Sequence, residues 1–196
     1  MLNNSEQDNY TLLIAKIDEF IRKYYKNRLI RGGIFSIALL VVLYLLFIGL
    51  EYFSYFTANV RTVLFYTYLM ATGGIIWRFV VIPILNLRRI GRVISHEMAA
   101  KIIGDHFPII KDQLINTLQL NDLNKSEKKN NALLLASIDQ KIIRLKPIPF
   151  ASAINISQNR KYLKYALIPL VLVLSILLSS PSIITGPSKR ILHYQT

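Results

Sequence analysis

Three long apolar stretches constrain the fold of this chain more than any other feature of its sequence. The first, IFSIALLVVLYLLFIGL, covers residues 34–50 and contains no charged residue. Each Ile, Leu, Val or Phe residue in it contributes about −0.3 to −0.6 kcal/mol to membrane insertion. Two further apolar stretches follow it. Because a helix needs about 20 apolar residues to cross a bilayer, we predict transmembrane helices at 34–57, 62–87 and 163–184.

Arg78 is the charged residue inside the second stretch, and two interpretations of it stay open. At a bilayer centre, this residue raises the free energy of membrane insertion by about 2.5 to 3.5 kcal/mol, and the favourable contributions of the surrounding aliphatic residues exceed that cost. Since Arg88 lies ten residues further on, Arg78 can extend beside Trp77 to the same membrane interface. This interpretation is favoured. In the alternative, Arg78 is a buried charge on a transport path.

The distribution of Lys and Arg predicts the orientation of the chain. Twenty of the 24 Lys and Arg residues lie in 1–33 and 86–165, which share one side of the membrane if all three helices cross it. Positive residues are retained on the cytoplasmic side. We therefore expect a multi-pass membrane protein. Its expected parts are a cytoplasmic helix at 1–33, a short outer turn at 58–61, a cytoplasmic domain at 88–162 and an outer segment at 185–196.

This orientation also accounts for the net charge of +13. A positive surface beside the membrane faces the anionic lipids of the cytoplasmic leaflet. Membrane lipid is therefore the expected contact, and a nucleic-acid partner is not expected. The chain has no cysteine, which excludes disulfides, thiolate metal ligands and cysteine nucleophiles.

The segments expected in the cytoplasm have the periodicity of amphipathic helices, with apolar residues three or four positions apart. Gly32-Gly33 can end or hinge the first helix just before the first span. Gly104 and Pro108 can divide the next stretch into two helices or kink a single one. The polar run at 121–131 predicts a loop. The predicted fold is an all-α membrane protein: three transmembrane helices, N-terminus in and C-terminus out, with a small cytoplasmic helical bundle. The predicted packing or interaction face comprises Ile17, Phe20, Tyr24, Ala99, Ile103, Phe107, Ile110, Leu114, Ile138 and Ile142.

The pair His96-Glu97 raises the question of a metal-dependent active site. Zinc peptidases use His-Glu-x-x-His because two histidines one turn apart can share a metal ion, but here Ala100 occupies the second position. His106 lies about 15 Å from His96 along an unbroken helix. We therefore expect no metal, no other cofactor and no enzymatic activity. A membrane enzyme that uses His96, Glu97 and His106 is a less favoured hypothesis, and it predicts bound metal.

Five strings along the chain carry a resemblance to a known family. They are KIDEFIRKYYKNRLIRG (16–32), ISHEMAAKIIGDHFPIIKDQLINTLQL (94–120), LLLASIDQKIIRLKPIPF (133–150), RKYLKYALIPL (160–170) and RILHYQT (190–196). The chain resembles the N-terminal region of a Bacteroidota family of large inner-membrane proteins, classed as a domain of unknown function. The resemblance implies that the membrane is the bacterial cytoplasmic (inner) membrane, so that the turn at 58–61 is periplasmic and residues 185–196 are the start of a longer periplasmic region. It brings no catalytic residues.

The expected function is that of a non-enzymatic anchor or scaffold subunit of a cell-envelope complex, coupling a cytoplasmic helical domain to a periplasmic part. Expected partners are other envelope proteins in a homo- or hetero-oligomer, and a cytoplasmic ATPase of the MoxR type by analogy. The alternative is a subunit of a transporter, channel or secretion or motility apparatus with a path between its helices. Glu51 falls at the outer end of the first span, and carboxylates are missing from the span centres. This pattern disfavours ion-coupled transport.

Overall fold

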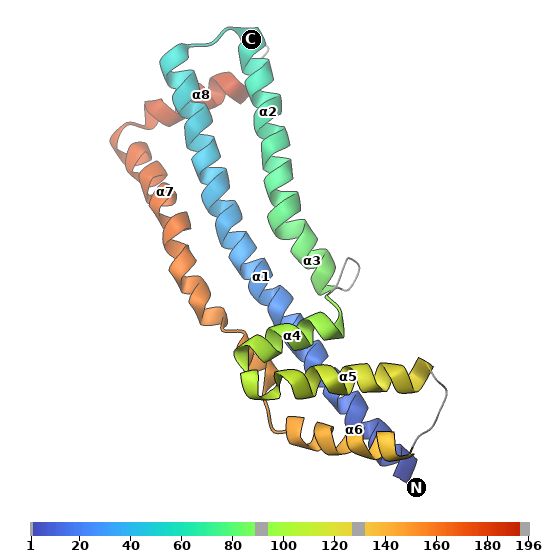
Figure 1. Ribbon diagram of the computed structural model, residues 1–196. Coiled ribbons are helices and arrows are strands. Elements are labelled where there is room, and N and C mark those ends of the chain that lie inside the picture. The colour runs from blue at the N-terminus through green and yellow to red at the C-terminus, as the bar shows by residue number, and fades with distance from the viewer. Residues whose placement is uncertain (1, 89–93, 127–131, 193–196) are drawn as a thin grey trace. The chain divides into compact units, whose positions relative to one another are not determined.

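The computed structural model of the chain describes residues 2–88, 94–126 and 132–192, and its regular secondary structure within these ranges is entirely helical (Figure 1). The chain divides into two compact units, which are described separately. The first, called the bundle here, comprises Met1–Lys26 and Arg92–Asn155, and the second, called the span unit, comprises Asn27–Gly91 and Ile156–Thr196.

Three helical segments are long and apolar enough to cross a membrane: Asn9–Ser54, Ala58–Leu87 and Phe150–Ser179. The prediction of an all-helical protein with three helices of this kind is therefore confirmed for the described residues. The kind of membrane, the orientation and the sides on which the termini lie stay predictions.

The first helix, α1 (Leu2–Ser54), runs without interruption through residues of both units. The predicted helix end at Gly32-Gly33 is therefore wrong, whereas the start of the membrane span at residue 34 stays a prediction. A glycine inside a helix costs only about 1 kcal/mol relative to alanine, which tertiary packing readily offsets. Gly32 is buried against the backbone of Phe79, so its small size serves close packing and not helix termination.

The second span begins at α2 (Ala58–Ile76), continues through the π-helix η1 (Trp77–Val81) and ends in α3 (Ile82–Leu87). Residues 58–61 are thus helical, and the predicted turn at these positions is wrong. The chain reverses instead in the three residues 55–57, between α1 and α2.

Pro83 explains the π-helical segment. Proline has no amide hydrogen, so it cannot donate to the carbonyl of Phe79 four residues earlier. The backbone instead adopts the wider register, in which the N–H of Ile82 donates to the carbonyl of Trp77. The Phe79 carbonyl therefore lacks its usual partner in the helix, and it points towards Gly32 of α1.

The third span, α7, covers Arg160–Ser179 and is followed after Ser180 by α8 (Pro181–Leu192). The predicted end of this span at residue 184 is too late, because Pro181 starts a new helix at the first position, where proline is well tolerated. α8 packs against both α2 and α7. Residues 185–192 are therefore part of the helical packing of the span unit, and His193–Thr196, where the periplasmic region was also predicted, lies outside the described residues.

The bundle is built from the beginning of α1 with α4 (His96–His106), α5 (Lys111–Ser126) and α6 (Ala132–Leu145). A 3-10 turn, η2 (Pro108–Ile110), joins α4 to α5, so the stretch forms two helices and not one kinked helix. The predicted loop at 121–131 is wrong in its first part, because α5 continues to Ser126; residues 127–131 lie outside the described residues. Two further 3-10 turns, η3 (Phe150–Ala153) and η4 (Ile156–Asn159), lead towards α7.

Gly104 does not end α4, which continues to His106. The glycine is buried where α5 begins, and a methyl group there would meet the side chain and the Cα of Lys111. Lys111 also donates a 2.7 Å hydrogen bond from Nζ to Oδ1 of Asp105. This bond raises the pKa of Lys111 above its usual value and joins the two helices across their turn.

Candidate functional sites

The predicted packing face lies largely inside the bundle. Eight of its residues are buried: Ile17, Phe20, Ala99, Ile103, Ile110, Leu114, Ile138 and Ile142. Tyr24 and Phe107 are only half-buried. The sequence pattern missed Tyr25, which is 2% exposed and whose hydroxyl accepts a 3.0 Å hydrogen bond from the N–H of Ile94. The i, i+4 spacing of Ile17, Ile21 and Tyr25 would have identified this wider apolar face.

Basic residues of α1 hold the segment that follows α6. Lys16 Nζ donates to the carbonyl of Lys146, just past the C-terminus of α6, and more weakly to the carbonyl of Ile148 at 3.4 Å. Lys23 Nζ donates to the carbonyl of Ala151 at 2.8 Å. A cation at a helix C-terminus satisfies carbonyls that have no partner in the helix and complements the helix dipole. Lys16 and Lys23 therefore hold α1 against the segment that follows α6 inside the bundle.

The histidines singled out in the sequence do not meet. His96 Nε2 lies 3.0 Å from Oδ1 of Asp18 on α1, at the start of α4, where the hydroxyl of Ser95 caps the helix. His106 is exposed at the other end of the same helix, with its ring centroid 4.7 Å from that of Phe107. Among the residues that the structure describes, no three His, Asp or Glu side chains are grouped as metal ligands. The third histidine, His193, lies outside the described residues.

A buried carboxylate joins three helices of the span unit. Glu51 of α1 is 0% exposed, with its Oε1 3.1 Å from Arg61 Nε on α2 and 3.7 Å from Arg190 Nη1 on α8. The guanidinium carbon of Arg190 also lies 4.6 Å from the ring centroid of Tyr55. An ion pair of this kind is costly to break from one side, because the remaining charge loses its partner. Glu51 and its two arginines therefore fix where α1, α2 and α8 meet.

Sequence reasoning did not find this cluster. Glu51 and Arg61 could have been paired across the short turn between the first two spans. Arg190 could not, because it follows Glu51 by more than a hundred residues and the helix that carries it was not predicted.

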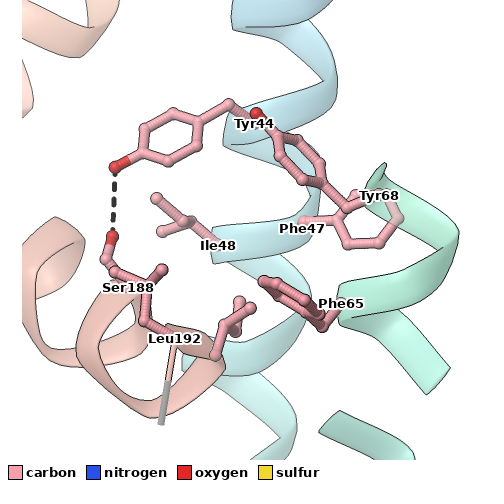
Figure 2. A pocket seen from close by; sticks show the side chains of 8 residues that line it. Tyr44, Phe47, Ile48, Phe65, Tyr68, Ser188 and Leu192 are labelled. Carbon is pink, nitrogen blue, oxygen red and sulfur yellow. Dashed lines mark hydrogen bonds between the residues drawn. The ribbon is translucent and has the colours of Figure 1, made fainter. Parts of the chain in front are cut away.

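An apolar cavity of about 180 Å³ lies between α1, α2 and α8 (Figure 2). Tyr44 Oη lies 3.0 Å from Ser188 Oγ, and this hydrogen bond spans one side of the cavity. The other residues that line the cavity are Phe47, Ile48, Phe65, Tyr68, Ile191 and Leu192. The lining contains no acid, base or cation. The cavity therefore suits an apolar group, and we assign no chemistry to it.

Arg78 lines a second cavity of the span unit, of about 300 Å³. Two further arginines of α1, Arg28 and Arg31, share this lining with it. The remaining lining residues are Gly32, Phe35, Phe79 and Pro83. Sequence reasoning singled out Arg78 and only counted Arg28 and Arg31 among the positive residues of 1–33, so it did not bring the three together. Arg28 and Arg31 lie about one turn apart on α1. The position of Arg78 beside them depends on how η1 packs against α1.

Comparisons with known proteins found no match for this chain. No model of a protein family, no curated protein and no solved structure matches this chain. The resemblance to the Bacteroidota inner-membrane family therefore stays a prediction.

Proposed function

We propose that this chain is a non-enzymatic anchor or scaffold subunit of a cell-envelope complex in the bacterial inner membrane. It would hold a folded cytoplasmic bundle on the membrane and couple it to a periplasmic part. The observation that carries this proposal is the continuity of α1. Its first residues form part of the core of the bundle, with Ile17 and Phe20 both 0% exposed, while its later residues form part of the span unit.

The use of α1 in both units favours a mechanical role. A passive membrane anchor needs only a span and a linker, and its linker need not be buried. Here, the hydrogen bonds from Lys16 and Lys23 and the hydrogen bond between Asp18 and His96 tie the N-terminal part of the same helix to the bundle. α1 therefore takes part in the packing of the bundle as well as in the span unit.

The spacing of two charged residues on α1 supports the proposed placement of the span unit in a bilayer. Arg31 and Glu51 are separated by twenty residues, which is about 30 Å of helix rise. This distance matches the hydrocarbon thickness of a typical bilayer, also about 30 Å. With Arg31 at the cytoplasmic interface and Glu51 at the periplasmic one, the residues between them, which include the buried Phe47, lie in the apolar layer.

Purification from native membranes tests the scaffold role. A chain tagged after Thr196 is cross-linked in cells, extracted in a mild detergent and compared with an unrelated three-span protein carrying the same tag. We expect a discrete complex that contains defined envelope proteins in fixed ratio, absent from the control. Recovery of a lone monomer in both the cross-linked and uncross-linked samples would refute the proposal.

The orientation has its own test. Reporters of location fused after Thr57, Asn124 and Thr196 should read periplasm, cytoplasm and periplasm, respectively. A periplasmic reading after Asn124 would reverse the proposed orientation. It would also show that the positive charges are not retained inside, contrary to the rule on which the proposal depends.

A further inference from the structure

Three arginines and no carboxylate are among the described residues that line the cavity at Arg78. Arg28, Arg31 and Arg78 all line it. Within the described part of the chain, no ion pair joins any of the three to an acidic side chain. Three like charges around one cavity repel each other, and the repulsion is relieved when an anion binds between them. Arginine is the residue best suited to hold a phosphate oxyanion, because its planar fork can donate two hydrogen bonds.

The backbone builds this cavity in a specific way. The π-helical register imposed by Pro83 shifts Arg78 and Phe79 relative to a regular helix. Gly32 lets the Phe79 backbone approach α1 closely, since any larger residue would overlap the carbonyl oxygen. π-helical segments of this kind are frequent at functional sites. The three arginines are therefore brought together by an unusual local structure and not by exposure on a common surface alone.

Aromatic rings orient one of the arginines. The guanidinium carbon of Arg31 lies 4.5 Å from the ring centroid of Tyr162 on α7 and 5.7 Å from that of Phe35. The rings of Phe35 and Tyr162 are themselves 5.3 Å apart. Such a cation–π attraction holds the guanidinium at the rings, and a guanidinium has five N–H groups with which to donate to an anion. Tyrosine rings are also typical of the headgroup level of a membrane.

An apolar groove adjoins the arginine cavity and shares two of its walls. The groove has a volume of about 370 Å³ and is lined by Phe35, Ala38, Leu39, Val42 and Phe79. The four α1 residues follow the i, i+3, i+4, i+7 pattern, so the groove runs along one face of the helix. Phe35 and Phe79 line both cavities. A ligand that fills both spaces must have an anionic end and a long apolar part.

We propose that this composite site binds one anionic phospholipid, with its phosphate between Arg28, Arg31 and Arg78 and an acyl chain along the groove. Basic pockets between transmembrane helices on the cytoplasmic side are suited to anionic headgroups. A soluble phosphate compound would use the arginines but gain nothing from the groove. The inference rests on the proposed membrane placement of the span unit and is independent of the scaffold role.

The test is lipid binding by the full chain, measured by native mass spectrometry from detergent micelles. The probes are phosphatidylglycerol, cardiolipin and zwitterionic phosphatidylcholine. We expect the two anionic lipids to bind at least tenfold more tightly than phosphatidylcholine. Arg31→Gln and Arg78→Gln should each lower this affinity about tenfold or more, the usual value of a charge-assisted hydrogen bond. Arg78→Lys should retain part of it.

A matched control distinguishes lipid binding at the arginine cavity from non-specific attraction of anionic lipid to the positive charge of the protein. Arg22→Gln removes the same charge from an exposed position on α1 in the bundle, and it should leave lipid affinity unchanged. A loss equal to that of Arg78→Gln would overturn the proposal in favour of non-specific attraction. Fluorescence of Trp77, the single tryptophan of the chain, checks that each variant keeps its fold.

A second variant tests the acyl chain. Val42 lines the groove and is half exposed. In the variant Val42→Trp, the larger side chain would fill the groove without entering the core. We expect this variant to lose lipid affinity while Arg31 and Arg78 are intact. Unchanged lipid affinity would overturn the assignment of the groove. Displacement of the lipid by equimolar glycerol phosphate or inorganic phosphate would instead identify a soluble phosphate as the ligand. If no anionic lipid binds to a chain that still copurifies with envelope proteins, the lipid site fails and the scaffold role stands.

Discussion

Replacing Gly32 with alanine is the sharpest test of how the span unit packs. An added Cβ at this position would overlap the backbone carbonyl oxygen of Phe79, and a backbone atom cannot move aside as a side chain can. The neighbouring Gly33 offers a matched control, because a Cβ there meets nothing within 4 Å. Both residues lie inside α1, so both substitutions gain the same helix propensity, about 1 kcal/mol.

The magnitudes follow from these two contributions. Gly33→Ala should stabilise the span unit by about 0.5 to 1 kcal/mol. Gly32→Ala gains the same amount but must separate α1 from η1, a strain of about 1 to 3 kcal/mol, as is usual for overpacking. The two variants should therefore differ by about 1 to 3 kcal/mol, with Gly32→Ala the less stable. At about 2 to 4 °C per kcal/mol in a chain of this size, the difference in melting temperature is about 2 to 12 °C.

The fluorescence of Trp77 provides the assay, because this residue lies in η1, two positions from the contact. Thermal unfolding of both variants and the wild type is followed in the same detergent. Equal melting temperatures for Gly32→Ala and Gly33→Ala would refute the close approach of α1 and η1. They would also remove the local structure on which the arginine cavity depends.

Three further substitutions test other parts of the chain. Ser95→Ala removes the cap of α4 and should cost about 1 kcal/mol; hydrogen exchange at α4 amides equal to wild type would contradict it. Gly104→Ala places a Cβ against Lys111 and should destabilise the bundle by about 1 to 3 kcal/mol, again read by exchange in α4 and α5. Glu51→Gln keeps the shape of the side chain but removes the charge that holds two arginines, and it should cost up to about 3 kcal/mol of span-unit stability. An unchanged Trp77 unfolding curve would show that the cluster does not hold α1, α2 and α8 together.

The periodic and apolar patterns were enough to predict the helical class and the three candidate spans. Such patterns are local: a run of apolar residues or a spacing of three and four depends only on near neighbours along the chain. For the same reason, Ile17, Phe20 and Ile103 were assigned to an apolar face that is buried in the bundle. The helix boundaries were less accurate. Gly32 and Gly104 were interpreted as helix ends because glycine usually weakens a helix, whereas both are sites of close packing.

The candidate sites required the tertiary structure, because their residues are far apart in the sequence. Glu51 meets Arg190 only because Pro181 begins a helix that packs back against α2. Arg78 joins Arg31 only because Pro83 alters the register of the second span where Gly32 admits its backbone. The sequence by itself determined which segments are helical and apolar, since that is decided by local composition. Only the packing of those helices decided which charges meet, because the pairing of distant side chains depends on how helix faces fit together in space.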